Sequence, residues 1–125
     1  PAGVLGGDLY TPLPPSLTGR VDVLLANAPY VPTDSIALMP PEARLYEPRI
    51  ALDGGPDGLD VHRRIASGAL RWLAPHGHLL VETSRRQASG SVKAFQHGGL
   101  AAEVVSSEEL DATIVIGWLQ RPRPL

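Results

Sequence analysis

The sequence has 125 residues, of which 13 are proline and 13 are glycine, with a net charge of −2 and no cysteine. This length suits a single domain with its own core, and the lack of cysteine excludes disulfides and thiolate metal sites. The acidic balance speaks against a broad basic surface for nucleic acid, and no apolar run approaches the ~20 residues that a membrane span needs. These features indicate a soluble cytoplasmic protein whose prolines and glycines punctuate its loops.

The first twenty residues have the composition of loops. Asp8 and Leu9 follow a pair of glycines, which is typical of a tight turn. Residues 11–19 are polar and rich in proline, and this predicts a connection on the surface. Taken alone, these residues give no reason to assign Asp8 or Leu9 a binding role.

The next segment is an apolar run that stops at a stiff turn. Residues 21–26, Val-Asp-Val-Leu-Leu-Ala, predict a short strand that is buried on both faces of a parallel α/β sheet. Asn27 follows directly, and open α/β sheets bind ligands at the carboxyl ends of their strands. Pro29 fixes its own φ and restricts Ala28 to an extended conformation, and Tyr30 adds an aromatic face. The turn therefore suits a planar substrate that forms hydrogen bonds.

Residues 31–60 are predicted to form a long connection rich in proline, with one turn of helix near 35–38 or 41–45. A loop longer than ~15 residues in a compact domain is usually functional or disordered, so we interpret this one as a flap that faces the substrate. Apolar residues then recur at helical spacing from residue 59 or 60 to residue 73, which predicts a helix.

The remaining pattern is a strand at 78–83, a weaker helix at 87–96, and strands at 101–105 and 113–119. The link between the last two strands is too short for a crossover helix, so we expect an antiparallel hairpin.

Two blocks of the sequence carry a family resemblance. Residues 27–30, Asn-Ala-Pro-Tyr, resemble the Asn-Pro-Pro-Tyr signature of amino-methyltransferases that use S-adenosylmethionine. Residues 47–60 look like a longer block of the HemK/PrmC family, whose members methylate the side-chain amide nitrogen of a glutamine in peptide-chain release factors. The short motif alone fits adenine methylation of nucleic acid equally well, whereas the longer block is much more specific. Together the blocks cover roughly residues 5–87.

The resemblance implies an α/β fold, namely the second half of a Rossmann-like class I methyltransferase sheet, mostly parallel with a C-terminal antiparallel hairpin. Residues 1–125 would then be a partial catalytic domain, because the glycine-rich cofactor turn and the ribose-binding acid of such folds are missing from the sequence. A half sheet leaves one flank of the strand at 21–26 unpaired, and a free edge invites pairing with another chain. We therefore expect self-association through that edge.

The resemblance also implies which residues carry the chemistry. The nitrogen of an amide is a poor nucleophile, and methyl transfer to it depends mainly on how the nitrogen is positioned. The side-chain oxygen of Asn27 and the backbone carbonyl of Ala28 would accept its two N–H groups and disperse its developing positive charge. Tyr30 would pack on the flat amide, and Pro29 would hold the turn. Ala28 is a departure from the family, which has proline there; the carbonyl is kept, but rigidity is lost.

Further residues enter through the same resemblance. Asp8 and Leu9 match a pair that lies beside the adenine of the cofactor, and Asn27 would also contact the cofactor. Glu47 and Pro48 belong to the longer block and would shape the substrate loop. The implied cofactor is S-adenosylmethionine, and the implied partner is a protein substrate, a peptide-chain release factor, with no membrane and with nucleic acid less favoured. The four histidines lack the spacing of metal ligands, so we expect no metal site.

Three functions stay open at this point. The first is methylation of a protein glutamine amide that depends on S-adenosylmethionine. The second is methylation of the exocyclic amine of a nucleic-acid base, which presents the same NH₂ geometry but fits the acidic charge less well. The third is a non-catalytic, truncated methyltransferase-like domain, which the missing glycine-rich turn and Ala28 favour.

Overall fold

The computed structural model describes residues 3–39 and 53–120. Within these ranges four strands form one sheet, in the order β1-β2-β4-β3. In chain order, the elements are η1 (Pro15–Leu17), β1 (Val21–Ala26), η2 (Thr33–Leu38), α2 (Asp60–Trp72), β2 (Leu73–Thr83), α3 (Ala88–His97), β3 (Leu100–Ser107) and β4 (Ala112–Leu119).

The sheet is mixed. β1 and β2 are parallel, whereas β4 is antiparallel to both β2 and β3. Three of these strands therefore run in one direction and β4 runs in the other. The predicted α/β fold with an antiparallel hairpin at its end is confirmed.

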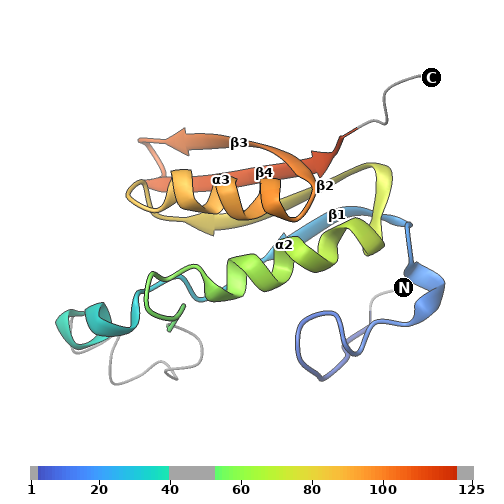
Figure 1. The fold of residues 1–125 in the computed structure, drawn as a ribbon, viewed down its shortest axis with the longest axis horizontal. Helices are drawn as coiled ribbons and strands as arrows, with labels where there is room; N and C mark the ends of the chain where they lie inside the picture. Colours follow the sequence, from blue (N-terminus) through green and yellow to red (C-terminus); the bar gives the residue numbers. More distant parts are fainter. Residues whose placement is uncertain (1–2, 40–52, 121–125) are drawn as a thin grey trace.

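Both helices pack against one face of the sheet. In Figure 1, α2 lies along β1 and α3 lies along β4. Phe95 of α3 is fully buried over Gly117 of β4, where a Cβ atom would lie 2.6 Å from the ring. Glycine at this position lets the helix approach the strand closely. The buried cluster is formed by Ala28, Ile65, Ala66, Ala69, Leu73, Leu79, Val81, Phe95, Leu100 and Val115.

The opposite face of β1 is open. Leu24 and Ala26 pack on the core, but Val23 and Leu25 are 61% and 72% exposed. The register puts Leu25 beside Leu80 of β2, so apolar residues continue across this face. The prediction that this strand is buried on both faces is therefore wrong for the described residues. An apolar run shows that a strand can be buried, but it does not show that a second layer covers it.

β1 is also an edge strand. Among the strands of the described ranges it pairs with β2 alone, so its outer flank keeps unpaired backbone groups. The free edge expected from the sequence is present, and association through it remains a prediction.

Two element boundaries differ from expectation. β2 begins at Leu73, directly after α2, because Leu73 pairs with Val21 before the register shifts at Val23. η2 covers the first of the two expected helical turns, whereas the second, at 41–45, and much of the expected flap lie outside the described residues. Within the described ranges, no helix has both the length and the apolar character needed to cross a membrane.

We expect the chain to self-associate through β1 and Leu25→Lys to weaken this association. Lysine on an edge strand opposes pairing because its charge would be brought against the second copy. Light scattering over a concentration series measures the effect. Leu110→Lys is the matched control, since Leu110 is 76% exposed and lies in the turn between β3 and β4. A wild-type chain that is monomeric at every concentration would contradict the expectation.

Candidate functional site

The turn at 27–30 leaves the carboxyl end of β1. Asn27 is exposed, Ala28 is buried, and Pro29 and Tyr30 are half-buried. Within residues 3–39 and 53–120, the Asn27 side chain has no hydrogen-bond partner. Its carboxamide is therefore open to a ligand at the edge of the sheet where α/β folds bind ligands.

Some backbone carbonyls of residues 28–31 accept a hydrogen bond from elsewhere in the described chain, and others do not. The Tyr30 carbonyl accepts from Gln87 Nε2 at 2.8 Å, and the Val31 carbonyl accepts from the amide of Gly54 at 2.8 Å. No donor in the described part of the chain reaches the carbonyl of Ala28. The Asn27 side chain and the Ala28 carbonyl, the two acceptors that the resemblance implies, are therefore both without a described donor, as is the carbonyl of Pro29.

A second loop, residues 53–58, lies directly against the turn. Val31 and Asp53 form a parallel bridge, and the amide of Thr33 donates to the carbonyl of Gly55 at 2.8 Å. The Thr33 hydroxyl donates to Asp53 Oδ1 at 2.7 Å. The two loops are thus joined mainly through their backbones.

Close approach explains the glycines of this second loop. A Cβ atom on Gly54 would overlap the carbonyl of Gly58 and lie 2.8 Å from the carbonyl oxygen of Pro29. Gly58 has φ of +80°, and a Cβ there would overlap both the Tyr30 carbonyl and Gln87 Nε2. The turn at 27–30 and the described part of the longer block are therefore packed together as one unit.

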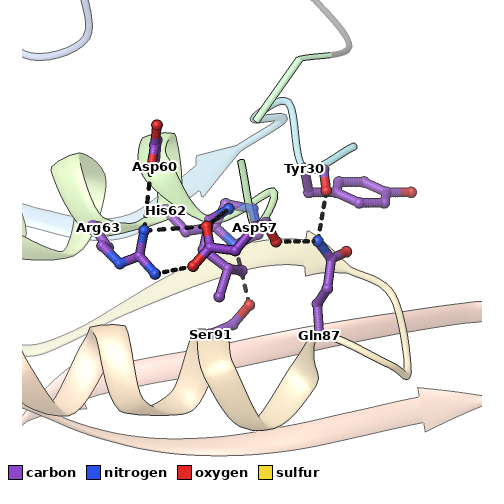
Figure 2. Close-up of polar contacts among 8 residues, drawn as sticks. Tyr30, Asp57, Asp60, His62, Arg63, Gln87 and Ser91 are labelled. Carbon is purple, nitrogen blue, oxygen red and sulfur yellow. Dashed lines mark hydrogen bonds and ion pairs between the residues drawn. The ribbon is translucent and has the colours of Figure 1, made fainter. Parts of the chain in front are cut away.

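Gln87 joins both loops to the start of α3, as Figure 2 shows. Its Nε2 donates to the carbonyl of Tyr30 and, at 3.0 Å, to the carbonyl of Asp57. The Ser84 hydroxyl donates to its Oε1 at 2.7 Å. Sequence analysis missed this residue, although Ser-x-x-Gln before a helix is a capping signature that could have drawn attention to it.

The Asp57 carboxylate fastens the loop to the start of α2. It accepts from the amide of Leu59 at 3.0 Å and pairs with the guanidinium of Arg63, which also reaches Asp60 (Figure 2). Hydrogen bonding to Arg63 holds the pKa of Asp57 below its usual range. Because these side chains are about half exposed, the pairs orient the loop more than they stabilise the fold.

A buried polar chain lies beneath Tyr30. His62 is fully buried, with Nδ1 3.1 Å from the hydroxyl of Ser91, which lies 3.1 Å from the hydroxyl of Thr83. The rings of His62 and Tyr30 are 6.4 Å apart. Burial lowers the pKa of His62 to about 4, and burial followed by the charge of Glu82 raises the pKa of Tyr30. Both rings are therefore neutral near pH 7 and provide a surface for packing.

Two of the residues implied for the cofactor, Asp8 and Leu9, lie on the segment before β1. The Asp8 carboxylate is 2.5 Å from the guanidinium of Arg64 on α2. Leu9 has φ of +49° and shares an apolar pocket of about 220 Å³ with Ala26, the neighbour of Asn27. Leu9 is thus brought to the carboxyl half of β1, whereas the carboxylate of Asp8 is held by α2.

Tyr10 anchors this segment. Its hydroxyl donates to the carbonyl of Ile65 at 2.7 Å, and burial raises the pKa of Tyr10 to about 12. Glu47 and Pro48, which were expected to shape the substrate loop, lie outside the described residues. Among the residues that the structure describes, no cluster of His, Asp or Glu has the arrangement of a metal site.

A strand followed by Asn-Ala-Pro-Tyr, in a sheet of order β1-β2-β4-β3 with an antiparallel last hairpin, is consistent with part of a class I methyltransferase sheet. No established family model matches the sequence. A release factor glutamine methyltransferase of Caulobacter vibrioides is 39% identical over 118 residues, which are 93% of this chain and 39% of that protein. One from Mycolicibacterium smegmatis is 39% identical over 108 residues, 86% of this chain and 38% of that protein.

A ribosomal protein uL3 glutamine methyltransferase of Burkholderia pseudomallei is 47% identical over 87 residues, 66% of this chain and 28% of that protein. The chain is therefore a relative of the glutamine methyltransferases, as the two motifs indicated. It spans less than two fifths of the length of these relatives.

We expect Gly58→Ala to destabilise the protein more than Gly19→Ala. Both glycines have positive φ, where a side chain costs about 1–2 kcal/mol. A Cβ on Gly19 meets no atom within 4 Å, whereas one on Gly58 overlaps Tyr30 and Gln87 and adds about 1–3 kcal/mol of overpacking. Denaturant unfolding measures both variants, and equal losses of free energy would contradict the packing argument.

The buried His62 predicts a pH dependence of stability. The unfolded chain protonates this histidine near pH 6.5, whereas the folded protein resists protonation down to about pH 4. The free energy of unfolding should therefore fall by up to about 3 kcal/mol as the pH drops through this window. His62→Gln should remove this slope, while the exposed His97→Gln should keep it. Identical pH profiles of the two variants would show that His62 is not the cause.

Proposed function

We propose that this chain forms the acceptor-binding part of a methyltransferase that acts on the side-chain amide nitrogen of a protein glutamine. The observation that supports this most directly is the pair of unpaired acceptors at the end of β1, the Asn27 side chain and the Ala28 carbonyl. An NH₂ group has two N–H bonds, and two acceptors on one stiff turn can hold both.

In this proposal the two acceptors position the amide nitrogen of the substrate. Asn27 and Ala28 hold the amide nitrogen with its lone pair directed at the methyl donor, and their oxygens stabilise the positive charge that develops on nitrogen. Bound S-adenosylmethionine would supply the methyl group from its sulfonium. Transfer would form a nitrogen–carbon bond, break the carbon–sulfur bond of the donor and release one proton from the nitrogen to water. Tyr30, kept neutral, packs on the flat face of the amide.

Ala28 is compatible with this role. The carbonyl needed for the hydrogen bond is present. Hydrogen bonds from other segments take the place of the rigidity that proline gives in the family. Gly54 donates to Val31, and Gln87 donates to Tyr30, so the turn is held from outside.

The cofactor would lie beside Leu9 and Ala26, whose apolar pocket suits a flat ring. Asp8 and Asn27 would contribute polar contacts. Because the sequence has no glycine-rich cofactor turn and spans 39% of the Caulobacter relative, we take residues 1–125 as a partial catalytic domain.

The substrate we propose is a peptide-chain release factor, modified in the cytoplasm. The names of the relatives divide between release factors and ribosomal protein uL3, so both proteins belong in the assay. The net charge of −2 disfavours methylation of a nucleic-acid base.

We expect Asn27→Ala, in the full-length protein, to lower kcat for methyl transfer by about 10²-fold or more, because one of the two acceptors is lost. Incorporation of labelled methyl groups into a purified release factor and into uL3 measures this, and calorimetry should find the affinity for S-adenosylmethionine only mildly changed. Asp34→Ala is the control, since Asp34 is exposed on the neighbouring η2. Methylation by Asn27→Ala at a near-normal rate would refute the assigned role.

A further inference from the structure

Every polar group of the Gln87 carboxamide is engaged. Its nitrogen donates to the carbonyls of Tyr30 and Asp57, and its oxygen accepts from the hydroxyl of Ser84. A carboxamide has one acceptor and two donor hydrogens, so this arrangement defines its orientation. Turning the group over would bring its oxygen against two carbonyl oxygens.

The side chain is also diverted from the local role that its position suggests. The hydroxyl of Ser84 accepts from the amide of Gln87 at 3.2 Å, as in a capping box. In a capping box the glutamine side chain returns to the amide of the capping residue. Here it instead reaches Tyr30, 57 residues away in the sequence. Figure 2 shows the Gln87 side chain pointing from the start of α3 toward Tyr30 and Asp57.

The contact acts on the part of the turn that carries the acceptors. Pro29 has a fixed φ, but Ala28 lacks the ring that would fix its own. The Tyr30 carbonyl belongs to the peptide between Tyr30 and Val31, so a hydrogen bond to it holds the end of the turn that carries the Ala28 carbonyl. The same carboxamide holds the Asp57 carbonyl, and Gly58 admits no side chain between the two loops.

We propose that Gln87 is a positioning residue for the methyl transfer, which fixes the direction of the Asn27 and Ala28 acceptors by tying their turn to residues 53–58. This inference rests on the proposed function. It assigns Gln87 no contact with the substrate, so its loss affects the rate of transfer more than binding.

The test compares Gln87→Leu and Gln87→Glu in the full-length protein, with Gln96→Glu as control because Gln96 is exposed on the same helix. Gln87→Leu removes all three hydrogen bonds, and a displacement of about 1 Å at a reacting centre costs about 10²-fold in rate. We expect kcat to fall by about that factor, with little change in KM for the acceptor protein or in affinity for S-adenosylmethionine.

Gln87→Glu adds a second measurement, the pH dependence of kcat, which a purely structural role would leave unchanged. A carboxylate would face two carbonyl oxygens, which raises its pKa above the ordinary value of ~4.3. The protonated form regains one donor, so the ratio of the variant kcat to the wild-type kcat should rise as the pH falls from about 8 to about 6. A flat ratio, or a kcat for Gln87→Leu equal to wild type, overturns the proposal while leaving the Asn27 result intact.

Amide hydrogen exchange tests, without any measurement of activity, whether Gln87 holds the turn at 27–30 against residues 53–58. The amides of Gly54 and Thr33 join the two loops, and both should exchange faster in Gln87→Leu than in wild type or Gln96→Glu. Unchanged exchange at both amides overturns the proposal even if Asn27→Ala shows that the proposed function is wrong.

Discussion

The site depends on two loops whose backbones touch with no side chain between them. Gly54 and Gly58 allow residues 53–58 to lie against the turn at 27–30, because a Cβ at either position would strike a carbonyl of that turn or of the loop itself. Gly54 of the second loop donates to the Val31 carbonyl and Gln87 donates to the Tyr30 carbonyl, whereas no described donor reaches the Ala28 carbonyl.

The turn at 27–30 and the residues packed beneath it offer a ligand hydrogen-bond acceptors and neutral rings. Burial keeps His62 uncharged near pH 7, and burial together with Glu82 keeps the phenol of Tyr30 protonated. Neither ring is suited to transfer a proton at that pH. Methyl transfer to an amide requires an oriented nucleophile more than an acid or a base, so a rigid and uncharged corner fits the proposed reaction.

The sheet around this corner is covered on one side. α2 and α3 bury Leu79, Val81 and Val115, while Val23 and Leu25 of β1 stay exposed on the other face. An exposed apolar face next to a free strand edge is a surface that proteins usually cover or pair. The relatives are more than twice as long as the segment they share with this chain.

Local pattern in the sequence determined the elements: an apolar run marked β1, helical spacing marked α2, and a short link marked the β3–β4 hairpin. It also determined the candidate turn, because proline and asparagine act within a few residues of themselves. The tertiary structure alone decided that Val23 is exposed, that His62 is buried beneath Tyr30, and that Gln87 reaches Tyr30. These facts join residues far apart in the chain, and periodicity reports which face of an element is apolar without reporting what lies against it.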